Sequence, residues 1–167
     1  AVAHAQAVQP VPALAGHVID STGTLQAGQQ AALEAKLAAL EAAKGSQVVV
    51  LMVPSTAPED IASYANRVGN TWKIGRKDVG DGVLLVVAKD DRKLRIEVAK
   101  ALEGAIPDLA AKQIIDEALT PRFKAGDYAG GLDVAVDQLA VRIKGEPLPS
   151  VTRADSGGSD PRGDGFQ

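Results

Sequence analysis

Two uninterrupted apolar runs constrain the fold of this chain more than any other feature of its sequence. They are QVVVLMV at residues 47–53 and GVLLVVA at residues 82–88. Each run has the length of a strand, and neither alternates polar with apolar residues, which is typical of strands that are covered on both faces. Such strands belong to sheets with helices packed on both sides, so the sequence predicts an α/β fold.

Segments with helical periodicity flank these runs. Apolar residues recur at helical spacing in residues 27–43, before the first run, and in residues 61–72, between the two runs. The Thr56–Glu59 segment has the pattern of a capping box for the second helix. A helix that connects two neighbouring strands in this way makes them parallel, through a right-handed crossover.

The rest of the chain predicts an edge strand and further helices. Residues 89–92 have the composition of a tight turn, and residues 93–98 alternate as an antiparallel edge strand would. Asp108 and Asp127 are each placed to cap a helix, and residues 17–20 can form a short first strand. The predicted fold class is a three-layer α/β/α sandwich with a small mixed sheet of about four strands and helices on both faces.

Composition excludes several classes of function. The chain has 167 residues and no cysteine, which excludes disulfides, thiol catalysis and thiolate metal sites. Two histidines argue against a histidine-rich zinc site, and a net charge of −3 gives no case for a nucleic-acid partner. The sequence contains no G-x-S-x-G motif, no P-loop and no H-E-x-x-H motif. A carboxylate nucleophile or a metal-bound water remains open as a route to hydrolysis.

The two ends of the chain differ from its middle. Ala5-Gln6-Ala7 has the small-x-small pattern of a signal-peptidase site, so residues 1–9 are interpreted as a signal-peptide remnant or as a flexible N-terminus. Residues 147–167 are rich in Gly, Ser and Asp and are predicted to be a disordered linker. Residues 10–146 are then the folded domain, which we expect to be monomeric.

Acidic residues gather at the ends of the predicted strands. Asp81 precedes the second apolar run, and Glu103 and Asp108 follow the strand antiparallel to it, so these three share one edge of the sheet. Asp20 joins them if the first strand is antiparallel to its neighbour, and lies at the opposite edge if it is parallel. Calcium and magnesium require several oxygen ligands. These four carboxylates are therefore the candidate metal ligands.

Most of these acids also have a structural interpretation. Asp108 can serve only as a helix cap, Asp81 only as a turn residue, and Asp20 only as the turn residue before the first helix. Glu103 has no such explanation, because neither a cap nor a hairpin turn requires an acid at its position.

Several separate blocks of the sequence, in order, resemble the TPM domain family. They are Val18-Ile19-Asp20, Trp72-Lys73-Ile74-Gly75, Asp81-Gly82 before a strand, and the Pro-x-Phe-x-x-Gly-Asp-Tyr block at residues 121–128. The resemblance covers roughly residues 10–145.

The resemblance implies a location and two alternative functions. Bacterial members are secreted or membrane-tethered, so we expect a periplasmic or secreted protein, tethered if at all through a segment outside this sequence. Plant relatives are described as acid phosphatases, and some members bind calcium or magnesium through acidic residues. The first expectation is thus a divalent-cation site with phosphatase-type hydrolysis. The alternative is a noncatalytic periplasmic interaction module that acts on or beside a membrane protein, so whether the chain is an enzyme stays open.

One loop departs from the family pattern. Relatives carry a Gly-aromatic-Gly triplet after the edge strand, whereas this chain has Ala99-Lys100-Ala101. Lys100 places a positive charge near the acids, which opposes a cation or favours an anionic group such as phosphate. Lys100 is therefore a further candidate site residue, together with Asp90 and Asp91 of the hairpin turn, for which a solvated turn is the competing interpretation.

Overall fold

The central sheet has four strands whose spatial order follows their order in the sequence. In the computed structural model, which describes residues 7–151, the first three strands are parallel and the fourth is antiparallel to the third. They are β1 (Val18–Asp20), β2 (Gln47–Val53), β3 (Gly82–Ala88) and β4 (Lys93–Val98). The predicted mixed sheet, with its parallel centre and its antiparallel edge strand, is confirmed.

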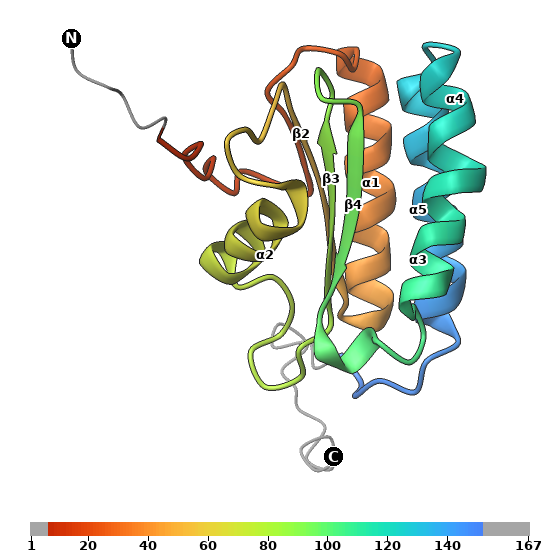
Figure 1. Ribbon diagram of the computed structural model, residues 1–167. Helices are drawn as coiled ribbons and strands as arrows, with labels where there is room; N and C mark the ends of the chain where they lie inside the picture. The colour runs from red at the N-terminus through yellow and green to blue at the C-terminus, as the bar shows by residue number, and fades with distance from the viewer. Residues whose placement is uncertain (1–6, 152–167) are drawn as a thin grey trace, which may run out of the picture.

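Helices cover both faces of this sheet, as the sequence predicted (Figure 1). On one face lies α2 (Ile61–Trp72), and on the other lie α1 (Ala27–Lys44) and α5 (Tyr128–Lys144). The chain between β4 and α5 forms η1 (Lys100–Leu102), α3 (Asp108–Ile114), the π-helical turn η2 (Ile115–Leu119) and α4 (Thr120–Lys124). No helix within residues 7–151 is long and apolar enough to cross a bilayer.

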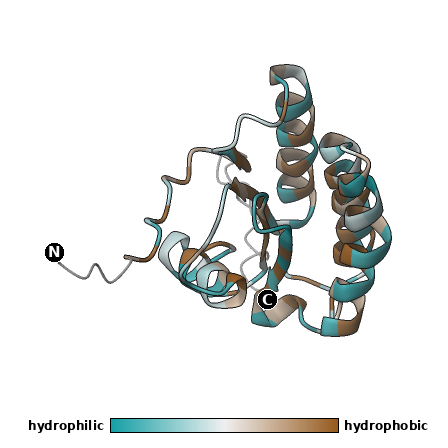
Figure 2. Ribbon diagram, turned by 45° about the horizontal axis from the view of Figure 1, so that its top comes forward, coloured by the Kyte–Doolittle hydropathy of each residue, from teal (hydrophilic) through white to brown (hydrophobic). Residues whose placement is uncertain are grey.

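The two apolar runs are buried because each supplies side chains to two cores. Alternate residues of β2 face opposite ways, so Val48, Val50 and Met52 pack with α1 and α5, while Val49 and Leu51 pack with α2. Every residue of β3 is buried as well. In Figure 2 the apolar colour of the sheet lies between the helices, whose outer faces are polar. Burial of this many aliphatic side chains, at about 1.5–3 kcal/mol each, is the main source of stability.

The starts of two helices differ from the sequence prediction. Asp60, and not Thr56, caps α2. The Asp60 side chain accepts a hydrogen bond from a backbone N–H of the first turn. The N-cap position of α3 is Pro107, so Asp108 is the first helical residue and its side chain makes no capping hydrogen bond. The predicted cap at Asp127 is confirmed, because its side chain accepts a hydrogen bond from a backbone N–H of α5.

His17 links the start of β1 to α1 through two glutamates. Its Nδ1 contacts the Glu34 carboxylate, and its Nε2 lies 2.6 Å from Glu41 Oε1. Burial alone lowers the pKa of His17, but the hydrogen bonds and charges of Glu41 and Glu34 outweigh burial. The pKa of His17 is therefore raised above its ordinary value.

The raised pKa of His17 predicts a loss of stability as the pH rises above the ordinary histidine pKa. The folded state holds its proton more tightly than the unfolded state, so the stabilisation is complete below about pH 6.5 and is lost as the pH rises through the folded-state pKa. We expect the free energy of unfolding of the wild type, measured in urea, to fall over this range relative to that of His17→Gln. A difference between the two proteins that stays constant with pH would contradict this assignment.

Candidate functional site

The direction of β1 separates the predicted metal ligands. Because β1 is parallel to β2, Asp20 pairs with Met52 near the carboxyl ends of the parallel strands. Asp81 precedes β3, at the opposite end of the strands. Glu103 and Asp108 lie at that same end, because they follow β4, which is antiparallel to β3. The alternative in which Asp20 joins these three is therefore wrong. Among residues 7–151, no group of three or more His, Asp or Glu side chains is arranged to hold a metal ion.

Asp81 is buried in an ion pair. Its side chain has no exposure to solvent, and its Oδ2 accepts hydrogen bonds from Arg76 Nε at 2.8 Å and Nη2 at 2.7 Å. Its Oδ1 accepts the backbone N–H of Arg76 at 2.8 Å. Both carboxylate oxygens of Asp81 thus accept hydrogen bonds within the protein, so Asp81 has a structural role.

Asp20 organises the loop that follows β1. Its Oδ1 accepts the backbone N–H of Thr22 at 2.9 Å and the hydroxyl of Thr22 at 2.5 Å, and its Oδ2 accepts the N–H of Leu25 at 2.8 Å. Burial raises the pKa of Asp20, but these hydrogen bonds together lower the pKa below its ordinary value. The interpretation of Asp20 as a turn residue agrees with this geometry.

The hairpin turn between β3 and β4 is fixed in the same way. Asp91 accepts hydrogen bonds from the Ser55 hydroxyl, at 2.9 and 2.8 Å from its two oxygens, and from the Thr56 N–H at 3.1 Å. Asp90 is exposed in the same turn. Arg92 closes the turn with a backbone φ of 55°, in the left-handed region. For a residue other than glycine this conformation costs about 1–2 kcal/mol.

A polar cleft at the amino end of β3 contains two of the predicted site residues. Glu103 and Lys100 both line it, in a space of about 450 Å³ between α2 and β4, and Asp108 does not. Glu97 lines it too, but its carboxylate is engaged by Asn66 Nδ2 at 3.2 Å and by Arg95. The four predicted carboxylates therefore do not fit a single calcium or magnesium site.

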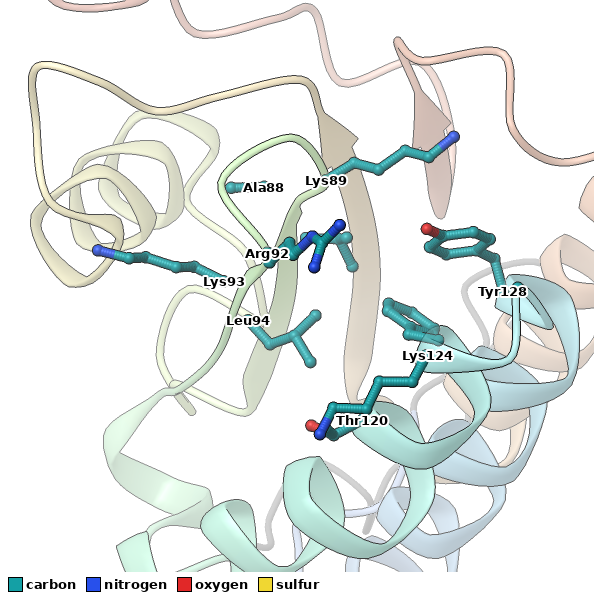
Figure 3. A pocket seen from close by; sticks show the side chains of 11 residues that line it. Ala88, Lys89, Arg92, Lys93, Leu94, Thr120, Lys124 and Tyr128 are labelled. Atoms are coloured by element: carbon teal, nitrogen blue, oxygen red, sulfur yellow. The ribbon is translucent and has the colours of Figure 1, made fainter.

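A second pocket, which we name the cationic pocket, opens at the carboxyl end of β3 (Figure 3). It encloses about 390 Å³. Four positively charged residues and no carboxylate are among its lining residues; the four are Lys89, Arg92, Lys93 and Lys124. Apolar and aromatic side chains, including those of Leu94, Phe123 and Tyr128, complete the lining.

The walls of the cationic pocket are held by specific contacts. Lys89 Nζ donates to the Thr24 hydroxyl at 2.8 Å and lies 4.9 Å from the centre of the Tyr128 ring, a cation–π contact. The Phe123 and Tyr128 rings pack with their centres 4.7 Å apart. The guanidinium of Arg92 points across the pocket toward Tyr128 and makes no hydrogen bond or ion pair within the described part of the chain (Figure 3).

Sequence reasoning did not find this pocket because its parts are far apart in the chain. The turn at residues 89–92 was correctly predicted as a turn, and Asp127 as a cap. These segments meet only because α4 and α5 pack against the sheet beside the hairpin. The available signal was the basic charge of the turn and the aromatic pair Phe123 and Tyr128 in the matching block.

Comparison with known proteins agrees with this fold. A family profile described as the TPM domain matches residues 18–142. The N-terminal domain of a protein from P. gingivalis is 29% identical, with a TM-score of 0.70 over 77% of this chain and 82% of that chain. No curated protein sequence matches.

Two more distant solved structures share the fold. The BA42 protein from the psychrophilic bacterium Bizionia argentinensis is 20% identical, with a TM-score of 0.65 over 79% of this chain and 89% of that chain. The N-terminal domain of the cg2496 protein from Corynebacterium glutamicum is 14% identical, with a TM-score of 0.60 over 90% of this chain and 93% of that chain.

The ion pair of Asp81 predicts a large effect of Arg76 on stability. Arg76→Met leaves a buried carboxylate without its partner, so we expect the free energy of unfolding to fall by about 3–5 kcal/mol. Lys112→Met, which breaks the exposed pair with Asp116, is the control and should cost less than about 1 kcal/mol. Equal, small losses in urea denaturation of the two variants would contradict the structural role of Asp81.

Proposed function

Because the chain belongs to the TPM domain family, we propose a function that the pocket geometry of this TPM domain supports: noncatalytic recognition of an anionic group. The observation that carries this proposal is the cationic pocket, whose lining residues include four positively charged ones and no carboxylate, and into which the Arg92 guanidinium points. The Arg92 guanidinium, which has no partner within the described residues, is the principal contact for the anion.

The electrostatics of the pocket favour an anionic ligand. Positive charges around a partly apolar space, with no acid among them, attract an anion into it. The planar guanidinium of Arg92 can bind a carboxylate or a phosphate with two parallel hydrogen bonds. The position also fits a general rule for α/β sheets, in which ligands bind outside the carboxyl ends of the parallel strands.

The lining of the pocket supports binding more than hydrolysis. It contains no carboxylate and no imidazole, and its side-chain hydroxyls belong to Thr120 and Tyr128. A hydroxyl is a weak nucleophile unless a neighbouring base activates it. We therefore favour the interaction module over the metal-dependent phosphatase that the family resemblance implied. The periplasmic or secreted location and the membrane-protein partner are part of this proposal and rest on that resemblance.

Inorganic phosphate is a direct probe of the cationic pocket. In an NMR titration at constant ionic strength we expect saturable shifts of the backbone amides of the lining residues. Arg92→Gln removes the guanidinium and should weaken binding by about tenfold or more, since hydrogen bonds to charged groups contribute about 1.5–3 kcal/mol. The matched control is Lys77→Gln. This variant removes one exposed positive charge at the amino end of β3, away from the pocket, and should leave affinity unchanged.

Two outcomes of this titration would overturn the proposed function. They are phosphate shifts spread over the whole surface, and equal affinity in the wild type and Arg92→Gln.

A stability measurement separates the effect of Arg92 on the backbone from its effect on binding. Because Arg92 has a φ of 55°, Arg92→Gly should raise the free energy of unfolding by about 1 kcal/mol while it weakens phosphate binding.

Turnover of para-nitrophenyl phosphate tests the alternative enzymatic function. We expect no turnover above the buffer rate with calcium, with magnesium or with neither ion, because the predicted acids lie at two edges of the sheet. The variant Glu103→Gln keeps the shape of the side chain and removes its charge. Activity in the wild type that Glu103→Gln abolishes would support a hydrolytic site in the polar cleft and contradict the noncatalytic function.

A further inference from the structure

The outer edge of β4 carries unpaired backbone groups. The Ala99 N–H donates to the Gly82 carbonyl at 2.9 Å, which marks this pair as hydrogen-bonded across the hairpin. Hydrogen-bonded and non-hydrogen-bonded pairs alternate along an antiparallel ladder. The N–H and C=O groups of Leu94, Ile96 and Val98 consequently point away from β3.

No other strand in residues 7–151 pairs with this edge. In Figure 1 the sheet is seen nearly edge-on between α2 and the layer of α1 and α5, with β4 in front of its neighbours. Ile96 is buried, and Leu94 and Val98 are half-buried, so the edge offers backbone groups more than side-chain surface. A sheet edge of this kind is a template for one more strand.

This edge leads directly into the cationic pocket. Lys93 and Leu94, the first two residues of β4, line the pocket, and Arg92 immediately precedes them. The charges from Arg92 to Val98 are uneven, with Arg92, Lys93 and Arg95 positive and Glu97 negative. A strand laid along β4 therefore meets positive charge near the start of β4, where a carboxylate can reach the Arg92 guanidinium in the pocket.

We propose that an extended acidic segment of a partner protein adds to β4 as a fifth strand and places a carboxylate beside Arg92. This inference rests on the proposed function and names the partner of the cationic pocket. Main-chain hydrogen bonds to Leu94, Ile96 and Val98 supply affinity that is independent of sequence, and the pocket supplies the preference for an acid. A segment of six residues at about 3.3 Å per residue spans the length of β4.

The test uses a synthetic peptide with two aspartates at one end followed by six residues of alternating Thr and Val. Two orders of the same residues, with the aspartates first or last, cover parallel and antiparallel addition. We expect one of them to slow hydrogen exchange of the Leu94 and Val98 amides by about tenfold at saturation. It should also shift the amides that line the cationic pocket.

Four matched controls, two in the peptide and two in the protein, separate the backbone contribution from the charge contribution. N-methylation of alternate peptide amides removes the ladder hydrogen bonds and should abolish protection of β4. Replacing the aspartates by asparagine should weaken binding by about tenfold, as should Arg92→Gln in the protein. The variant Lys77→Gln, in the loop before β3 at the opposite end of the strands from the pocket, should leave binding unchanged.

The outcomes distinguish this inference from the proposed function. If phosphate binds the cationic pocket but no peptide protects β4, the ligand is a small anion, and the partner strand is refuted while the proposed function stands. Equal protection by the aspartate and asparagine peptides would also overturn the inference, because the pocket would then play no part. If neither phosphate nor peptide binds, both proposals fail.

Discussion

A buried ion pair between Arg76 and Asp81 joins segments that lie far apart in the sequence. Besides its bonds to Asp81, the guanidinium donates to the carbonyl of Lys44 at the end of α1 and to that of Pro149 after α5. Gly45 is required beside it, because its φ is 85° and a Cβ there would lie 2.4 Å from Arg76 Cζ. A buried carboxylate is costly without such a partner, so this contact determines how the loop before β3 meets both helices, and with it where β3 begins.

With β3 fixed in this way, the two ends of the sheet serve different purposes. At the amino end of β3, Asp81 is fully engaged in holding the fold together. At the carboxyl end, Asp20 and Asp91 accept hydrogen bonds from the loops after β1 and β2, and Lys89 reaches across to Thr24. These bonds fix the hairpin turn that carries Arg92 and the position of Lys89, and under the proposed function this order lowers the conformational entropy that binding must overcome.

The sequence predicted those parts of the fold that depend on the pattern of a single segment. The two apolar runs predicted buried strands, and the alternation in residues 93–98 predicted the edge strand, because these patterns follow directly from which faces are covered. The direction of β1 could not be predicted, since a strand of three residues carries no signal of orientation. The ion pair between Arg76 and Asp81, only five residues apart, was missed because the sequence does not show the loop conformation that brings their side chains together. The cationic pocket was missed because only tertiary packing brings its lining residues together.

The net charge of the whole chain does not reveal the local positive charge around the cationic pocket. The sequence has a net charge of −3, yet many of its acids are already partnered: Asp81 by Arg76, Asp20 and Asp91 by loop hydrogen bonds, and Asp133 and Asp137 by Lys36. None of these carboxylates lines the cationic pocket, so its positive potential is not neutralised from within. The left-handed backbone of Arg92 costs about 1–2 kcal/mol, a noticeable share of the 5–15 kcal/mol that stabilises a typical domain. Glycine would relieve this strain, so stability does not explain an arginine there. The proposed binding of an anion by its guanidinium gives the arginine a role that glycine could not fill.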